Sequence, residues 1–131
     1  MVVTRHVFES DAFPPVPGED TETNPGIYGR ALAAWLAEAL GAAGYVVEWV
    51  VAEDFGWVVE LAHPGCTLYA AVASTDTSAR RWHAFAFAEL GLLARLRRSS
   101  AAAPAVSKLM TDLKRLLEAS SVVRSLREEP T

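Results

Sequence analysis

Apolar side chains occupy every second position over much of the segment 45–74, which two short turn sequences interrupt. A period of two is typical of β-strands, because successive side chains point to opposite faces of a sheet. The pattern predicts three antiparallel strands, at 45–52, 57–63 and 66–74. The turns predicted between them are Asp54-Phe55-Gly56 and Pro64-Gly65.

Each turn predicts a register for the strands that it joins. A three-residue turn with Gly56 at its last position pairs Trp49 with Leu61. The second turn pairs His63 with Cys66. In these registers the apolar faces of the three strands coincide, which predicts a single core face. The residues expected on it are Tyr45, Val47, Trp49, Val51, Trp57, Val59, Leu61, Leu68, Ala70 and Val72.

The other face of the predicted sheet is also apolar for the most part. Its residues are Val46, Glu48, Val50, Val58, Glu60, Tyr69 and Ala71. A face that meets water usually alternates more cleanly between apolar and polar residues. We therefore infer that this face is partly covered, either by another segment or by a second copy of the chain.

The residues before the sheet predict a strand, a loop and a helix. The strand is expected at 2–8, and the loop at 10–23, which is rich in proline and acidic residues. Asn24 and Pro25 are typical of a helix start, as the cap and the first helical residue. Apolar residues then recur every three or four positions up to Ala43, and Gly41 or Gly44 is expected to end the helix.

The residues after the sheet predict a fourth strand, two helices and a last strand. The strand is expected at 81–88 and a short helix at 89–98. A small-residue connector follows at 99–103, and Pro104 starts another helix. Segment 121–127 is interpreted as a short edge strand.

The helices are expected to cover the core face of the sheet. Trp35 of the first helix should pack against Trp49 or Trp57. The apolar stripe between Val106 and Leu117 in the last helix is close to a heptad pattern, so it fits a dimer contact as well as the core, and we expect the core. The chain is therefore predicted to be one α+β domain, residues 1–131, with an antiparallel β-sheet and helices in a two-layer sandwich.

Composition narrows the class of protein. Hydrophobic residues make up 51% of the 131 residues, which suits a globular domain. A run of about 20 apolar residues is absent from the sequence, so we expect no membrane span. The N-terminus lacks the pattern of a signal peptide. The one cysteine forms no internal disulfide, and a cytoplasmic location is expected.

Charge is distributed unevenly along the chain, although the net charge is only −4. Residues 1–79 contain two basic and eleven acidic residues, whereas residues 80–131 contain ten basic and five acidic ones. Such asymmetry can mark a nucleic-acid surface. We favour complementarity between two parts of one fold, because the basic residues are scattered without interleaved aromatic residues.

Two motifs resemble a family of small uncharacterised bacterial proteins. One motif is a helix start, NPGIYGRALAAWL, and the other is an EDFGW turn at residues 53–57. The resemblance spans most of the chain and implies a bacterial origin and this fold, but no activity. By size, acidity and element order the chain also resembles type III secretion chaperones and small immunity proteins.

Several residues fit a catalytic or ligand-binding role, and each of them also has a structural interpretation. Glu53 and Asp54 beside Trp57 could be an acid–base pair, or they could be solvated turn residues, one of which pairs with Arg30. His63 and Cys66 supply two ligands, whereas a zinc site needs three or four, and a catalytic cysteine needs an ordered histidine. The NPGIYG helix start could bind an anion with its free N–H groups. The candidate binding surface comprises Arg30, Glu53, Asp54, Trp57, Arg81, Trp82 and His83.

The sequence thus predicts a non-catalytic protein-interaction module of the bacterial cytoplasm, similar to an adaptor, an immunity protein or a chaperone. We expect a protein partner or self-association as a homodimer, and no metal, cofactor, membrane or nucleic acid. The alternative is a small-molecule-binding protein or enzyme with a pocket near Arg30, Glu53, Asp54 and Trp57.

Overall fold

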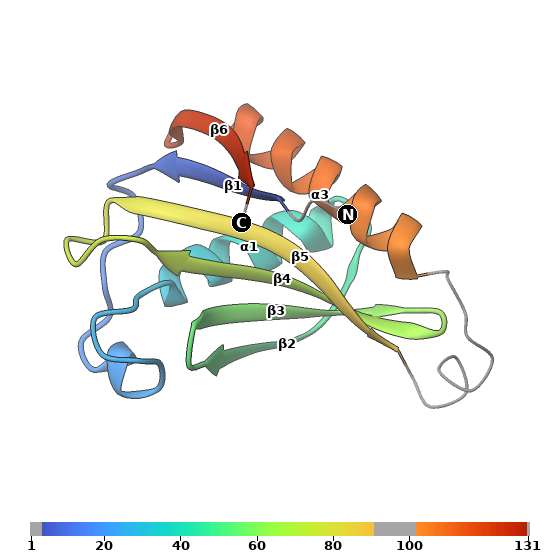
Figure 1. Cartoon of the computed structure of the whole chain (residues 1–131), viewed down its shortest axis with the longest axis horizontal. Coiled ribbons are helices and arrows are strands. Elements are labelled where there is room, and N and C mark those ends of the chain that lie inside the picture. Colours follow the sequence, from blue (N-terminus) through green and yellow to red (C-terminus); the bar gives the residue numbers. More distant parts are fainter. Residues whose placement is uncertain (1–3, 91–101, 131) are drawn as a thin grey trace.

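The computed structural model describes residues 4–90 and 102–130, and its strands form one six-stranded antiparallel sheet (Figure 1). The strand order is β2-β3-β4-β5-β1-β6, so β2 and β6 are the edges. The strands are β1 (Thr4–Glu9), β2 (Val46–Glu53), β3 (Gly56–His63), β4 (Cys66–Ser74), β5 (Arg81–Leu90) and β6 (Arg124–Pro130). The helices are the short 3₁₀ helix η1 (Glu19–Thr21), α1 (Arg30–Ala42) and α3 (Ala102–Ala119).

Helices α1 and α3 pack against the same face of the sheet. The first covers β2, β3 and β4, and the second covers β5 and β4. Leucines from both helices join the inward-facing strand residues in one buried cluster. Its largest fully buried members are Trp82, Phe8, Leu32, Leu36, Leu40, Leu61, Leu68, Leu109, Leu113 and Leu117. The predicted α+β class and antiparallel sheet are confirmed.

The hairpin of β3 and β4 has the predicted register. His63 pairs with Cys66 and Leu61 pairs with Leu68. The alternating apolar residues of both strands are buried on the helix side, as expected from their period of two. This hairpin therefore forms the centre of the core.

The hairpin of β2 and β3 differs from the prediction. Its turn has two residues, so Glu53 pairs with Gly56, and the pairing slips by one position. A bulge between Val47 and Trp49 restores Val47 to the core face, because one extra residue reverses the faces of a strand. Trp49 instead pairs with Glu60 on the outer face and is 65% exposed. The expected core positions of Trp49 and, by the same slip, Val51 were wrong. Val50, expected on the outer face, pairs with Val59 and lies on the helix side at the sheet edge.

The outer face of the sheet is partly covered by its own aromatic side chains. Phe55, in the β2–β3 turn, has its ring centroid 6.2 Å from that of Phe85 and 6.4 Å from that of Phe87. Val58 and Ala71, which pair with each other on this face, are fully buried. Among the described residues, Phe55 of the turn and the side chains of neighbouring strands cover part of this face. Cover by a second copy of the chain stays a prediction.

The first helix begins five residues later than predicted. Residues 24–27 form a turn in which the amide of Ile27 donates to the carbonyl of Asn24 over 3.0 Å. Gly26 has a φ of +81°, which suits the position after proline in a type II turn. Proline therefore shapes a turn here, and α1 starts only at Arg30. Gly44, with a φ of +101°, follows the end of α1 as predicted.

The remaining elements agree in part with the prediction. The stripe of α3 is in the core, and segment 124–130 forms the edge strand β6, three residues later than expected. The short helix predicted at 89–98 begins with two residues that belong to β5, and its other residues lie outside the described residues. Trp35 packs against Phe13, at 5.7 Å between ring centroids, and joins the buried cluster that contains Trp57. It was also expected near Trp49, which lies on the opposite face of the sheet.

Candidate functional site

Arg30 and Trp57, two of the predicted site residues, lie together on the helix side of the sheet. The guanidinium carbon of Arg30 is 5.6 Å from the centroid of the Trp57 ring, a cation–π distance. Glu53 lies on the outer face at the end of β2, and Asp54 is exposed in the turn. The four side chains are thus divided between opposite faces of the sheet and do not share a pocket.

The other three predicted residues follow one another in β5 and have different surroundings. Trp82 is buried in the core, where its ring N–H donates to the carbonyl of Ser10 over 3.2 Å. Arg81 is exposed and lies 3.5 Å from a carboxylate oxygen of Glu9. His83 faces the outer side with Arg5. The sequence Arg81-Trp82-His83 is therefore not one surface.

His83 is a neutral hydrogen-bond acceptor in this arrangement. A guanidinium nitrogen of Arg5 donates to its Nδ1 over 2.9 Å. Burial, and then the charge of Arg5, lower the pKa of His83 to about 4. The ring is also 5.4 Å from that of Phe85, so it extends the aromatic row of the outer face.

The start of α1 already holds an anionic group from the chain itself. Glu19 is fully buried, and its Oε1 accepts hydrogen bonds from the amides of Gly29 at 2.8 Å and Arg30 at 3.1 Å. Its Oε2 accepts from the amide of Val16 at 2.6 Å. Two of the N–H groups at the helix start that the sequence suggested for a bound anion, those of Gly29 and Arg30, are thus bonded to a carboxylate of the chain itself.

Cys66 and His63 are adjacent but lack the features of a catalytic pair. The Sγ of Cys66 is 3.5 Å from the Nδ1 of His63, and the same nitrogen is 3.0 Å from the carbonyl of Pro64. Burial raises the pKa of the Cys66 thiol. A nucleophilic cysteine needs a lowered pKa, so this environment disfavours the thiolate.

The outer face contains a hollow of about 340 Å³, lined by acidic and aromatic side chains. We call it the acidic hollow, and its residues are Glu53, Phe55, Val58, Glu60, Tyr69, Phe87 and Glu89. The rings of Tyr69 and Phe87 stack, with centroids 4.7 Å apart. The hydroxyl of Tyr69 donates to Glu89 over 2.9 Å. Only Glu53 of the predicted site residues lies here.

Electrostatics distinguish the acidic hollow from an ordinary apolar depression. Burial, the hydrogen bond to Glu89 and the negative charges of Glu89, Glu60 and Glu53 raise the pKa of Tyr69 to about 12. All three carboxylates therefore act on the same phenol. The negative charge of the hollow is concentrated over an aromatic floor.

A second surface feature lies on the edge strand β2 and its turn. Val46 and Trp49 are 63% and 65% exposed, and Val50 and Phe55 are also exposed. We call these four residues the β2 patch, which wraps around the free edge of β2. Val46 and Trp49 pair with Ala62 and Glu60 on the outer face, whereas Val50 pairs with Val59 and lies on the helix side. Phe55 belongs both to the patch and to the acidic hollow, so the two features adjoin.

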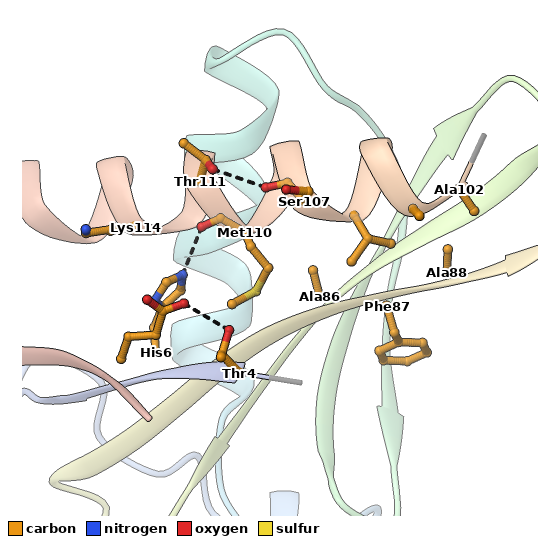
Figure 2. Close-up of a pocket in the computed structure, with 13 residues that line it drawn as sticks. Thr4, His6, Ala86, Phe87, Ala88, Ala102, Ser107, Met110, Thr111 and Lys114 are labelled. Carbon is orange, nitrogen blue, oxygen red and sulfur yellow. Dashed lines mark hydrogen bonds between the residues drawn. The ribbon is translucent and has the colours of Figure 1, made fainter. Parts of the chain in front are cut away.

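A larger cavity, of about 750 Å³, lies between α3 and strands β1 and β5 (Figure 2). The Nε2 of His6 is 2.8 Å from the carbonyl of Met110, so this nitrogen is the donor. The Thr4 hydroxyl donates to Glu128 over 2.9 Å. The alanines of β5 and the side chain of Met110 make the rest largely apolar. His6 is held by a backbone carbonyl of α3.

The described residues offer neither a metal site nor a membrane span. Within 4–90 and 102–130, no three His, Cys, Asp or Glu side chains are placed to hold a metal ion. None of the helices in those ranges is both long and apolar enough to cross a membrane.

Comparisons with protein-family models, curated proteins and solved structures return no match for this chain. The resemblance to a bacterial family therefore stays a prediction, and the geometry of the surface has to support any proposal on function.

Sequence reasoning missed the residues that the sheet gathers on its outer face. Tyr69 pairs with Phe87 across β4 and β5, and with Glu60 across β3 and β4. Glu89 was expected in a helix. The outward position of Phe87 was visible in the alternation of β5, but its neighbours follow only from the strand order.

Proposed function

We propose that this chain is a non-catalytic protein-interaction module that binds another protein, or a second copy of itself, through the β2 patch. One observation carries the proposal. Of the five large apolar side chains that are exposed among the described residues, four belong to the patch. Covering them would remove apolar surface from water, which is the main favourable term in protein association.

The position of the patch suits the addition of a strand from the partner. Within the described residues β2 pairs only with β3, so its other edge has backbone groups that a partner strand could bond. The bulge before Trp49 interrupts the regular ladder. The segment from Trp49 to Glu53 is then the stretch available for regular pairing.

In this proposal the chain is a two-layer sandwich whose helices leave the free edge of β2 and the adjoining outer sheet face open to the partner. We propose the bacterial cytoplasm as its location, because a lone cysteine such as Cys66 suits a reducing compartment.

The test compares Trp49→Ser with Val122→Ser. Both substitutions remove an exposed apolar side chain, but Val122 lies outside the patch, before β6. Light scattering across a range of protein concentrations measures self-association, and co-purification from an extract of the source bacterium measures binding to another protein. We expect the wild type and Val122→Ser to behave alike, and Trp49→Ser to lose the complex.

Two results would contradict the proposal. One is a wild-type chain that stays monomeric and captures nothing in a Trp49-dependent way. The other is a complex that Val122→Ser and Trp49→Ser weaken equally.

A further inference from the structure

The acidic hollow has the composition of a site for an organic cation. Its floor is formed by the stacked rings of Tyr69 and Phe87, and Phe55 lies at its side. Aromatic faces attract cations through their quadrupoles, most strongly where water is partly excluded. A volume of about 340 Å³ is at the lower end of the range for ligand pockets, and it can admit a long side chain.

The charge around these rings selects a positive group. Glu53, Glu60 and Glu89 line the hollow, and no ion pair to any of them occurs among the described residues. Elsewhere on the same sheet two acidic residues do pair: Glu9 with Arg81 and Glu129 with Arg5. The hollow therefore has negative charge that complements a positive partner.

Guanidinium fits this surface better than other cations. The carboxylates are not placed to share a metal ion. A guanidinium is planar, stacks on aromatic rings and donates to two carboxylate oxygens at once, whereas an ammonium is a strongly hydrated point charge. The combination of stacked rings with flanking carboxylates matches these properties of arginine.

We propose that the acidic hollow binds an arginine side chain of the protein partner. The inference rests on the proposed function, because the hollow adjoins the β2 patch through Phe55 and a partner on the patch would reach it. The arginine stacks on an outer face of the Tyr69–Phe87 pair, since the inner faces of the two rings contact each other, and its guanidinium donates to carboxylates at the rim. The patch supplies apolar contact, and the hollow selects a basic segment.

The experiment uses N-acetyl-L-arginine amide as the probe and the full chain labelled with ¹⁵N. Two matched compounds serve as controls: N-acetyl-L-citrulline amide, which has nearly the same shape without charge, and N-acetyl-L-lysine amide, which has charge without a plane. Titration is followed by NMR at low salt. We expect the arginine probe to shift the amide signals around Tyr69 and Phe87. Its affinity should exceed that of the citrulline probe at least tenfold and that of the lysine probe severalfold.

Substitutions of residues that line the hollow test whether the arginine probe binds there. The double substitution Glu60→Gln and Glu89→Gln should weaken the arginine probe at least tenfold. Glu38→Gln, on the exposed side of α1, changes the net charge without touching the hollow and should leave the affinity unchanged. Tyr69→Leu should weaken binding, whereas Tyr69→Phe, which keeps the ring, should preserve it.

The proposal is overturned if citrulline or lysine probes bind as well as arginine, or if the double variant binds arginine like the wild type. Either result leaves the β2 patch intact as a docking surface, because the Trp49→Ser test does not depend on the probe. The two proposals can therefore fail separately.

Discussion

Gly56 begins β3 with a φ of +153°, and a Cβ added to it would lie 2.4 Å from the carbonyl oxygen of Val72. Gly65, in the next turn, has a φ of +80° but open space around it. We expect Gly56→Ala to lower the free energy of unfolding by about 3 kcal/mol or more, because it adds a backbone clash to an unfavourable φ. Gly65→Ala should lower the free energy of unfolding by only about 1–2 kcal/mol, because the positive φ disfavours alanine but no atom clashes with the added Cβ. Urea unfolding measures both, and equal losses would contradict the packing at Gly56.

Glu19 is a fully buried carboxylate that accepts three backbone hydrogen bonds. Its removal leaves amides such as that of Gly29 without a partner, and each buried donor of this kind costs about 1–3 kcal/mol. We expect Glu19→Ala to destabilise the chain by about 2–4 kcal/mol in urea unfolding. Glu22→Ala, in the same loop but exposed, is the control and should change stability by less than about 0.5 kcal/mol. A similar small effect at Glu19 would show that its hydrogen bonds do not anchor α1.

His83 makes stability depend on pH in a defined window. Burial, followed by the charge of Arg5, lowers the pKa of His83 from 6.5 to about 4. Between these values the unfolded chain binds a proton that the folded chain does not, so this contribution is complete above pH 6.5 and is lost as pH falls towards 4. Because one proton is involved, the free energy of unfolding changes by at most about 1.4 kcal/mol per pH unit. The partial exposure of His83 makes the change smaller.

The substitution His83→Gln isolates this contribution. Urea unfolding at pH 7, 6 and 5 should show a smaller loss of stability for the variant than for the wild type, because the carboxylates titrate alike in both proteins. A variant that loses as much stability as the wild type over this range would refute the assignment.

At the level of elements, the alternation of apolar residues predicted the strands better than it predicted their faces. The register of β3 and β4 followed from the turn alone, because no residue is inserted in either strand. In β2 the two-residue turn moved Trp49 to the outer face, and the bulge returned Val47 to the core face. A bulge has no strong sequence signal, and one extra residue reverses every later side chain. The error at Trp49 therefore concealed the exposed patch.

The candidate site was less predictable than the fold. Arg30 and Trp57 are neighbours, but Glu53 and His83 lie on the opposite face of the sheet. The acidic hollow depends on which strands are adjacent, because β3, β4 and β5 each contribute lining residues. Local patterns do not encode that adjacency. The EDFGW turn motif identified Glu53 as a site residue. The sequence did not predict that Glu60 and Phe87 lie beside Tyr69 on neighbouring strands.

Helix α3 contributes to the core through a leucine stripe whose heptad-like spacing also fitted a dimer contact. Leu109, Leu113 and Leu117 are fully buried against the sheet. We expect Leu113→Ala to lower the free energy of unfolding by about 2–5 kcal/mol, from lost burial and a residual cavity. Leu116→Ala, at a half-buried position, should cost less. Light scattering should show an unchanged mass for folded Leu113→Ala, and a specific loss of self-association would place the stripe in an interface instead.

At the scale of the whole molecule, ion pairs within the fold join some acidic residues of the first part of the chain to basic residues of the second part. Asp11, from the acidic part of the chain, lies 3.6 Å from Arg80 and 3.2 Å from Arg124. These pairs are exposed, so each contributes little to stability, but they agree with complementarity between the two parts. In the acidic hollow, by contrast, three carboxylates gather without an ion pair among the described residues.

The central claim is that the β2 patch is covered by protein when the chain functions. The most direct measurement is photo-crosslinking from the patch itself, with p-benzoylphenylalanine in place of Trp49 and, in a separate control, in place of Val122. Both positions are exposed, so the probe should not disturb folding at either. We predict a crosslinked protein adduct, to a partner or a second copy, from position 49 and none from position 122. Equal crosslinking from both positions, or none from position 49 in cells of the source organism, would contradict this claim.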